Sequence, residues 1–528
     1  MRDFQYRPTR RSVLTGAGTL IASSVVPDAY AQVVAAAMPV AESLAESAAQ
    51  PFNRSTVAMM AREMAQKEYV PPNSELPPEI ADLSYEQYRG IISTRENALW
   101  SDTDLPFRLH LFHRGFYYKD EVEVSIVTEG ESRHLRYSPD LFTFGETVPR
   151  PLPKGDIGFA GIRLLGRINA PDRYDEIAIF QGASYFRAVG RDQVYGLSAR
   201  GLALKTAAPE GEEFPIFRSF WVETPNPDSE TIVVHALLDS QSVTGAYRFT
   251  IRPGGSTTMD VEAVIFPRVD LDKVGIAPGT SMFFFGPNDR GDVDDYRPEV
   301  HDSDGLLIVN GRGERLWRPL SNPRTLQTSA FLDVGPRGFG LAQRDRNFSS
   351  YEDIEATYER RPSLWIEPVG DWGRGTVTLV EIPTESEIHD NIVAYWQPED
   401  VIPAGSEYSF AYRIFWGHEP QMPEGGVRAV STRIGRGEIA GPSALRLFVI
   451  DYIATGPTPA PDAPAPTATV SSGGGKIDHV TISRNPANGG WRLTFRLDPE
   501  DQELIELRAT LDFPDDRVAE TWVYRWTA

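Results

Sequence analysis

The spacing of apolar residues changes from a helical period to a strand period at about residue 107. Before that point, STVAMMAREMAQK (Ser55–Lys67) places apolar residues three and four apart after a serine, which predicts an amphipathic helix with a serine N-cap. Beyond it, apolar and polar residues alternate in RLHLFHRGFYY (Arg108–Tyr118) and EVEVSIV (Glu121–Val127). The two residues between these segments predict a β-hairpin.

Short alternating segments bounded by Gly and Pro continue along the chain. They are Ile232–Leu238, Ala246–Ile251, Thr258–Phe266, Ser281–Phe285, Leu306–Asn310, Leu364–Pro368, Gly375–Glu381, Ile392–Gln397 and Tyr408–Trp416. The long helices that a parallel α/β fold needs between its strands are not indicated. The pattern therefore predicts a mainly β fold whose N-terminal part, residues 51–420, is a large antiparallel β-sandwich.

A second, smaller unit is predicted after residue 420, where EPQMPEGG (residues 419–426) is typical of a linker. Its strands are expected at Ala444–Tyr452, Ile477–Arg484, Trp491–Leu497, Leu504–Asp512 and Glu520–Trp526. This spacing predicts an immunoglobulin-like sandwich over residues 421–528. Residues 455–476, which are rich in Pro and Ala and then in Ser and Gly, are expected to form a flexible loop inside it.

The N-terminus has the pattern of an export signal. Arg10 and Arg11 precede a mildly apolar run, Leu14–Val26, and small residues at Ala29 and Ala31 follow it. We interpret residues 1–31 as a signal peptide of the twin-arginine type, followed by an Ala-rich segment over residues 32–50. The apolar run is too short to span a bilayer, so a periplasmic protein without stable membrane insertion is expected.

Composition narrows the function classes. Lys and Arg number 52 against 74 Asp and Glu, a net charge of −22, which argues against nucleic acid as a partner. The absence of Cys excludes disulfides, thiolate metal sites and thiol nucleophiles. No serine-hydrolase, zinc-protease or dinucleotide motif occurs, and neither a cofactor nor a metal is predicted. Carboxylates and aromatic rings remain, and glycan-cleaving sites combine these two groups.

The first carboxylate-rich segment spans residues 283–322. Asp302 and Asp304, two residues apart, would face the same way in extended chain. A solvated acidic loop or an Asp-Gly turn explains the same pattern. A calcium loop is a further interpretation for the earlier aspartates of this segment, but they lack the ligand spacing of an EF-hand; these residues are Asp289, Asp292, Asp294 and Asp295.

The second segment spans residues 358–397. Asp390 precedes the apolar strand Ile392–Trp396, and desolvation beside aromatic rings would raise its pKa toward that of a general acid. A plain turn before the strand is the competing interpretation. Arg360, Arg361 and Arg374 would bind either sugar hydroxyls or surface acids, and the sequence favours surface acids.

Several motifs in order give the chain a family resemblance. They are PFNRSTVAMMAREMA, NALWSDTDLPFRLHLFHRGFYY, DDYRPEVHDSDGL, ERLWRPLSNP, YERRPSLWIEP, VEIPT and DNIVAYWQPE. From about Pro51 to the C-terminus the chain resembles the OpgG/OpgD (MdoG/MdoD) periplasmic glucans biosynthesis proteins. The twin-arginine leader is more similar to the OpgD branch.

The resemblance implies a galactose-mutarotase-like sandwich joined to an immunoglobulin-like domain, acting on β-1,2-linked glucan. It implies an inverting endo-β-1,2-glucanase with Asp390 as general acid and Asp302 on the base side, acting through a relay that includes a substrate hydroxyl. By the same resemblance Tyr358 and Arg361 line the cleavage site, and we place Asp304 with them as a substrate-binding residue. Trp317, Trp365 and Trp396 are candidate sugar platforms, and at least one of them is expected to belong only to the core.

Two other activities remain open at this point. A transglycosylase on the same glucan would share the general acid, and a non-catalytic glucan-binding protein would work with the inner-membrane glucan synthase. Neither the synthase as a partner nor a homodimer is decided by the sequence.

Overall fold

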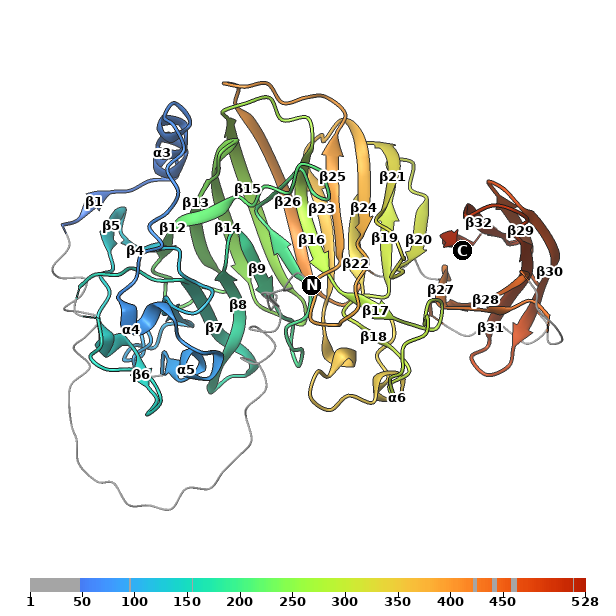
Figure 1. The fold of residues 1–528 in the computed structure, drawn as a ribbon, viewed down its shortest axis with the longest axis horizontal. Helices are drawn as coiled ribbons and strands as arrows, with labels where there is room; N and C mark the ends of the chain where they lie inside the picture. Colours follow the sequence, from blue (N-terminus) through green and yellow to red (C-terminus); the bar gives the residue numbers. More distant parts are fainter. Residues whose placement is uncertain are drawn as a thin grey trace, which may run out of the picture. The chain divides into compact units, whose positions relative to one another are not determined.

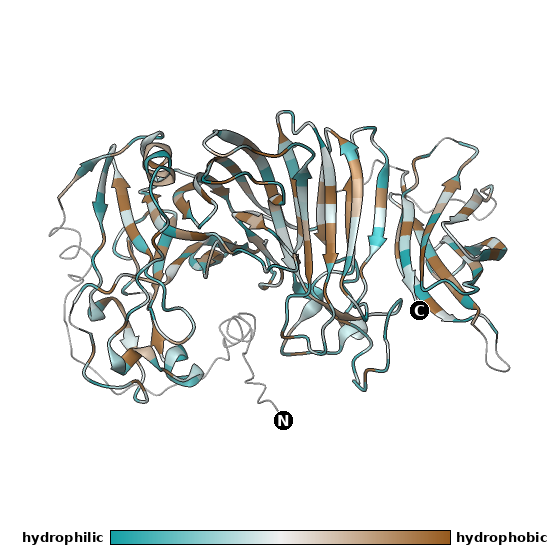
Figure 2. Ribbon diagram, turned by 45° about the horizontal axis from the view of Figure 1, so that its top comes forward, coloured by the Kyte–Doolittle hydropathy of each residue, from teal (hydrophilic) through white to brown (hydrophobic). Residues whose placement is uncertain are grey.

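The computed structural model describes residues 48–94, 96–153, 155–420, 425–438, 444–456, 463–515 and 517–528. The predicted signal peptide and nearly all of the Ala-rich segment lie outside these residues. Strands dominate the described chain (Figure 1), and hydropathy alternates from residue to residue along many of them (Figure 2). The predicted mainly β fold is confirmed. Among the described residues, no helix has the length and apolar character needed to cross a membrane.

The chain forms two compact units. The first comprises the described residues up to Pro278 together with Asp400–Gly417, and the second comprises Gly279–Glu399 together with His418–Ala528. The predicted division at residue 420 stays a prediction.

The first unit is a β-sandwich. One of its sheets runs, in spatial order, through β1 (Gln50–Pro51), β5 (Glu131–His134), β4 (Glu123–Thr128), β12 (Ile216–Glu223), β13 (Ile232–Asp239), β14 (Val243–Arg252), β15 (Thr257–Pro267) and β26 (Tyr408–Gly417). The other contains β10 (Ser198–Arg200), β9 (Tyr185–Ala188), β8 (Arg173–Gln181), β7 (Gly161–Ala170) and β3 (Phe107–Phe112), and β11 (Leu202–Leu204) pairs with the start of β16 (Val274–Ser281). Phe180 of β8 contacts Phe249 of β14 with ring centroids 5.1 Å apart, so buried aromatic rings fill the space between the sheets.

Short elements border this sandwich. They are α4 (Pro78–Ala81), α5 (Tyr85–Arg89), the 3-10 turn η2 (Pro139–Leu141) and the small ladder of β2 (Ile91–Ile92) with β6 (Thr143–Phe144).

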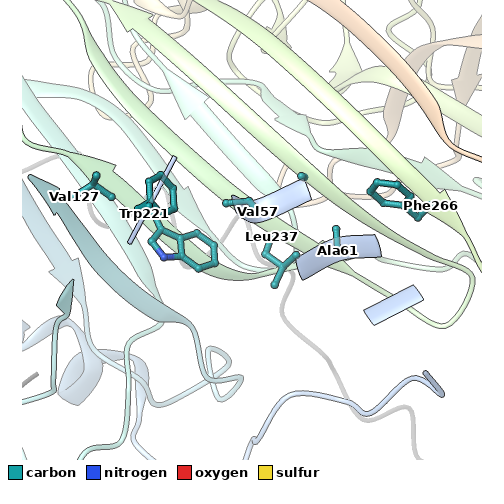
Figure 3. Packing of buried hydrophobic residues seen from close by; sticks show 8 residues of the cluster. Val57, Ala61, Val127, Trp221, Leu237 and Phe266 are labelled. Carbon is teal, nitrogen blue, oxygen red and sulfur yellow. The ribbon is translucent and has the colours of Figure 1, made fainter. Parts of the chain in front are cut away.

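Helix α3 (Thr56–Ala65) packs on the large sheet of the first unit. Val57 and Ala61 lie against Trp221, Leu237 and Phe266 (Figure 3). The helical period predicted this element, and Ser55 occupies the N-cap position as predicted, but its side chain does not cap the helix. The Ser55 hydroxyl donates to Asn53 Oδ1 at 2.7 Å and makes no bond to the helix.

The predicted hairpin between residues 108 and 127 is also wrong. Strand β3 pairs with β7, whereas β4 pairs with β5 and β12, so the two predicted arms belong to different sheets. Buried Arg114 explains the separation, because it donates to the carbonyl oxygens of Lys119 at 2.9 Å and Asn73 at 2.7 Å. These bonds hold the intervening segment in a compact loop.

The second unit contains a mixed sheet and two smaller ladders. In spatial order the sheet runs β23 (Ser363–Val369), β22 (Gly338–Ala342), β19 (Gly305–Val309), β20 (Arg315–Pro319), β33 (Thr521–Thr527), β32 (Leu504–Asp512) and β29 (Thr467–Ser472). The ladders are β21 (Gln327–Val334), β24 (Arg374–Glu381) and β25 (Ile392–Pro398), and the pair β17 (Phe283–Phe285) and β18 (Val300–His301). Only two short helical turns, α6 (Phe348–Tyr351) and η3 (Tyr358–Arg360), occur among its described residues.

The C-terminal strands of the second unit form a smaller sandwich. A four-stranded sheet of β27 (Val427–Arg436), β28 (Arg446–Ala454), β31 (Gly490–Asp498) and β30 (Lys476–Asn485) supplies one layer. Phe448 and Phe495 of this layer contact Trp522 of β33 in the other layer, with centroids 6.0 and 6.1 Å away.

The predicted loop over residues 455–476 needs a correction. Residues 457–462 lie outside the described part, but Thr467–Ser472 form β29 and pair antiparallel with β32. β-Branched residues in TATVSS favour a strand, and the adjoining Pro and Gly obscured this signal.

Candidate active site

Asp302 lies at the end of a short ladder in the second unit. Phe283 of β17 pairs with His301 of β18, and the Asp302 backbone N–H donates to the Met282 carbonyl at 2.8 Å. The Asp302 side chain is fully buried, and Met282, whose carbonyl accepts from Asp302, belongs to an apolar cluster with Tyr351. The ladder of β17 and β18 (Figure 1) therefore fixes the backbone at Asp302.

Arg361 pairs directly with Asp302. Its Nη1 donates to Asp302 Oδ1, and its Nε and Nη2 both donate to the Ala356 carbonyl at 3.1 Å. The guanidinium also lies 4.1 Å from the ring centroid of Tyr358. Burial lowers the pKa of Arg361, but the charge and hydrogen bond of Asp302, together with Tyr358 and Glu387, raise it overall. The guanidinium thus stays charged beside Asp302.

Asn391 ties the segment that carries Asp390 to the same ladder. Its Oδ1 accepts from the Phe283 N–H at 2.9 Å, and its Nδ2 donates to the Phe283 carbonyl at 3.0 Å. Asp390 is the preceding residue and is half-buried. Because Met282 holds Asp302 and Phe283 holds Asn391, the two predicted carboxylates come from segments anchored on consecutive residues.

Glu387 is a third carboxylate at this site, and the sequence analysis missed it. It lies three residues before Asp390, and its Oε2 accepts from the Tyr358 hydroxyl at 2.6 Å and from Arg297 Nη1 at 2.9 Å. Arg297 also donates to Asp353 at 2.7 Å. The hydrogen bonds of Asp295 and then of Glu387 raise the pKa of Arg297 against the effect of burial. An irregular loop gave no periodic signal for Glu387.

Asp304 occupies a different environment from Asp302. Its Oδ2 accepts from the backbone N–H groups of Arg344 at 3.1 Å and Asp345 at 3.3 Å. Its Oδ1 is buried and has no hydrogen-bond partner among the described residues. Burial raises the pKa of Asp304, against the opposing charges of His301 and Arg344. Asp304 therefore bonds to the 344–345 backbone, whereas Asp302 bonds to Arg361.

All three candidate tryptophans belong to the core, not only one of them, so none presents the predicted sugar platform. Trp317, Trp365 and Trp396 are 4%, 5% and 0% exposed. Each ring packs over a glycine, and a Cβ placed on that glycine would lie 2.1–2.6 Å from the indole; the glycines are Gly305, Gly338 and Gly375. An exposed aromatic ring lies instead in the loop between β17 and β18, residues 286–299, which we call the acidic loop: Tyr296 is 76% exposed.

Two aspartates of the acidic loop are held by a backbone N–H group and by an arginine. Asp289 Oδ2 accepts from the Asn322 N–H at 2.9 Å, and burial raises the pKa of Asp289 to about 6. Asp295 pairs with Arg297 at 2.7 Å. Within the described ranges, no group of three or more His, Asp or Glu side chains is placed to hold a metal ion.

Comparison with known proteins gives a consistent match over the chain. The family model described as "Periplasmic glucan biosynthesis protein, MdoG" matches residues 52–526. Glucans biosynthesis protein G of Shewanella sp. strain MR-4 is 58% identical over 476 residues, 90% of this chain and 87% of the relative. Glucans biosynthesis protein G 1 of Shewanella oneidensis has the same identity and coverage.

Among solved structures, a galactose mutarotase related enzyme from Lactobacillus acidophilus covers 49% of this chain and 94% of its own. Its identity is 10% and its TM-score is 0.21, which is too low to bear on the fold.

Proposed function

The chain belongs to the MdoG family of periplasmic glucan biosynthesis proteins, and on this premise we propose that it is a periplasmic endo-β-1,2-glucanase. Residues 1–31 are the proposed export signal. The proposed substrate is a linear β-1,2-glucan, cleaved with inversion at the anomeric carbon. The D-type branch suggested by the leader stays a prediction, since the relatives described above carry the name of protein G.

Asp390 is the proposed general acid. An inverting glycosidase needs one carboxylic acid to protonate the leaving oxygen and one carboxylate to activate water on the opposite face of the sugar. Asp390 is half-buried at the entrance to β25, where a carboxyl group remains accessible to a leaving oxygen. The observation that carries the proposal is the shared anchoring of the Asp390 and Asp302 segments at Phe283 and Met282.

Asp302 is the proposed final proton acceptor. Its burial and its pairing with Arg361 argue against direct contact with the attacking water. A relay through a substrate hydroxyl fits this position: water gives its proton to the hydroxyl oxygen as the hydroxyl passes its own proton toward Asp302. Tyr358 and Arg361 line this path. The Tyr358 hydroxyl donates its hydrogen bond to Glu387, so toward a sugar hydroxyl its oxygen acts as an acceptor.

The test is incubation of the purified protein with linear β-1,2-glucan, followed by product masses and optical rotation. Shorter linear products whose rotation reports the inverted anomer are expected. Asp390→Asn should lower the rate by about 10³-fold or more, whereas Asp501→Asn, at an exposed turn, serves as the matched control. Intact glucan at high protein concentration, or a wild-type rate for Asp390→Asn, would overturn the proposal.

Transglycosylation is the second candidate, favoured by relatives named for biosynthesis of glucans. In this reaction a glucan hydroxyl replaces water as the acceptor and Asp390 keeps its role. Mass spectrometry separates the two outcomes, because a cyclic product is lighter by one water than the linear chain of equal length. Glucan binding without any turnover would instead support the non-catalytic role beside the membrane synthase.

A further inference from the structure

His301 is a fully buried histidine directly before Asp302. Its ring stacks on Phe283 with centroids 5.5 Å apart and an interplanar angle of 8°, and it meets the Tyr351 ring edge-on at 5.3 Å. These contacts fix the plane of the ring. Its two nitrogens then face Gln343 Oε1 at 2.9 Å and Glu299 Oε2 at 2.8 Å.

The partners of Gln343 determine the protonation of the His301 ring. Gln343 Nε2 donates to two backbone carbonyls, those of His301 at 3.0 Å and Tyr358 at 3.2 Å. The amide orientation is therefore fixed, with Oε1 toward the ring as an acceptor. His301 Nδ1 must carry a proton to make this bond.

The other ring nitrogen faces a carboxylate. Glu299 Oε2 accepts, so Nε2 also carries a proton and His301 is an imidazolium. Burial alone lowers the pKa of a histidine, but the hydrogen bond and charge of Glu299 and the nearby charge of Asp304 raise it here. Arg344 and Arg346 from the following segment lie close enough to influence Asp304 or Tyr351. Glu299 is thus the principal counter-ion of His301.

The bonds among Glu299, His301 and Gln343 connect to two residues of the proposed cleavage site, Asp302 and Tyr358. His301 is bonded through the backbone to Asp302, and Gln343 holds the Tyr358 carbonyl at the start of η3. We propose that Glu299, His301 and Gln343 form a positioning chain in which a permanently charged imidazolium fixes Asp302 and Tyr358 relative to each other. Its effect on cleavage rests on the proposed function, whereas the charge of His301 does not.

The charge is tested by NMR of the full chain labelled with ¹⁵N-histidine. The chain has eight His, and the His301→Gln spectrum identifies the His301 signals by their loss. His479→Gln, which removes an exposed histidine, is the matched control. Both His301 nitrogens should remain protonated at about pH 7.5, where an ordinary histidine with a pKa of about 6.5 is mostly neutral. A neutral ring at that pH would overturn the proposal.

The positioning role is tested by kinetics on linear β-1,2-glucan. Glu299→Gln keeps an acceptor for His301 but removes the counter-charge, so kcat should fall by about 10- to 100-fold with KM changed less than about threefold. Glu299→Asp, which keeps the charge, should recover most of the loss. Unchanged kcat in Glu299→Gln, or a loss confined to KM, would refute positioning.

Failure of the proposed function and failure of the positioning chain give different results. If wild-type protein cleaves no glucan, the proposed function fails while the NMR measurement still decides the charge of His301. In that case positioning is read from hydrogen exchange of the Asp302 backbone N–H, which bonds to the Met282 carbonyl; Glu299→Gln should accelerate this exchange and Glu299→Asp should preserve it. Equal exchange rates in all three proteins would overturn it.

Discussion

The Tyr358 hydroxyl donates to Glu387 Oε2 across 2.6 Å, and this bond joins the η3 turn to the loop that carries Asp390. The same Glu387 oxygen accepts from Arg297, so it has a fixed cation on one side and a phenol on the other. Tyr358 is 2% exposed, which makes the bond part of the packed site.

Removal of this hydroxyl is expected to impair cleavage more than folding. Tyr358→Phe deletes one hydrogen bond and keeps the ring beneath Arg361, so stability should fall by only about 1–2 kcal/mol. If Tyr358 lines the proposed cleavage site, the rate of glucan cleavage should fall by about 10- to 100-fold, because the proposed acceptor for a sugar hydroxyl is lost. Tyr117→Phe, at a half-exposed ring of the first unit, is the control for both assays. Full activity of Tyr358→Phe would exclude the hydroxyl from the relay.

The buried pair of Arg361 and Asp302 makes a distinct prediction about stability. Both side chains are at most 3% exposed, so Arg361→Met leaves an uncompensated buried carboxylate and should cost about 3–5 kcal/mol. The double variant Arg361→Met with Asp302→Asn removes that charge and should be more stable than Arg361→Met alone. Urea unfolding of the wild type, both single variants and the double variant measures the coupling. Additive losses would show that the pair is not coupled in the folded state.

Alternation along the chain predicted about half of the strands among the described residues, because a period of two is a local property of a half-buried strand. Long strands such as β7 and β8 were missed. Pairing is not local. The parallel contact of β20 with β33 joins segments about two hundred residues apart, and only tertiary packing determines it. For the same reason the hairpin after residue 108 was predicted incorrectly, since the carbonyls that hold Arg114 lie in other segments.

The candidate site shows the same limit. Asp302 and Asp390 were recognisable in the sequence as candidate catalytic carboxylates. The structure shows that the bonds of Asn391 to Phe283 bring their two segments together. Periodicity identified Trp396 as a strand residue. It did not show that the ring packs over Gly375, so it could not distinguish a tryptophan that binds sugar from one that belongs to the core. Glu387 lies in no periodic pattern, and only its tertiary bonds to Tyr358 and Arg297 indicate a role.

Tyr296 replaces the buried tryptophans as the proposed sugar platform. Its ring is 76% exposed in the loop between β17 and β18, in the second unit. Tyr296→Ala should raise KM by about 3- to 10-fold, the size of one aromatic contact, and leave kcat and the free energy of unfolding nearly unchanged. Tyr117→Ala is the matched control. An unchanged KM for oligosaccharides of every length would remove Tyr296 from the binding surface.

His113 in the first unit should make stability depend on pH. The ring is buried, its Nε2 lies 2.9 Å from the Tyr137 hydroxyl, and burial lowers the pKa of His113 to about 4. The unfolded chain binds a proton near pH 6.5 and the folded chain does not, so stability is lost as pH falls from about 6.5 to about 4. The full loss amounts to about 3 kcal/mol.

The His113 contribution is isolated by comparison with a variant that does not titrate. Urea unfolding of the wild type and of His113→Gln between pH 7 and pH 4 should give a shallower pH dependence for the variant, even if its stability at pH 7 is lower. His479→Gln removes an exposed histidine and should follow the wild-type curve. Because the carboxylates titrate in all three proteins, their contribution cancels in the differences. Parallel curves for the wild type and His113→Gln would mean that the buried ring is not the source of the acid sensitivity.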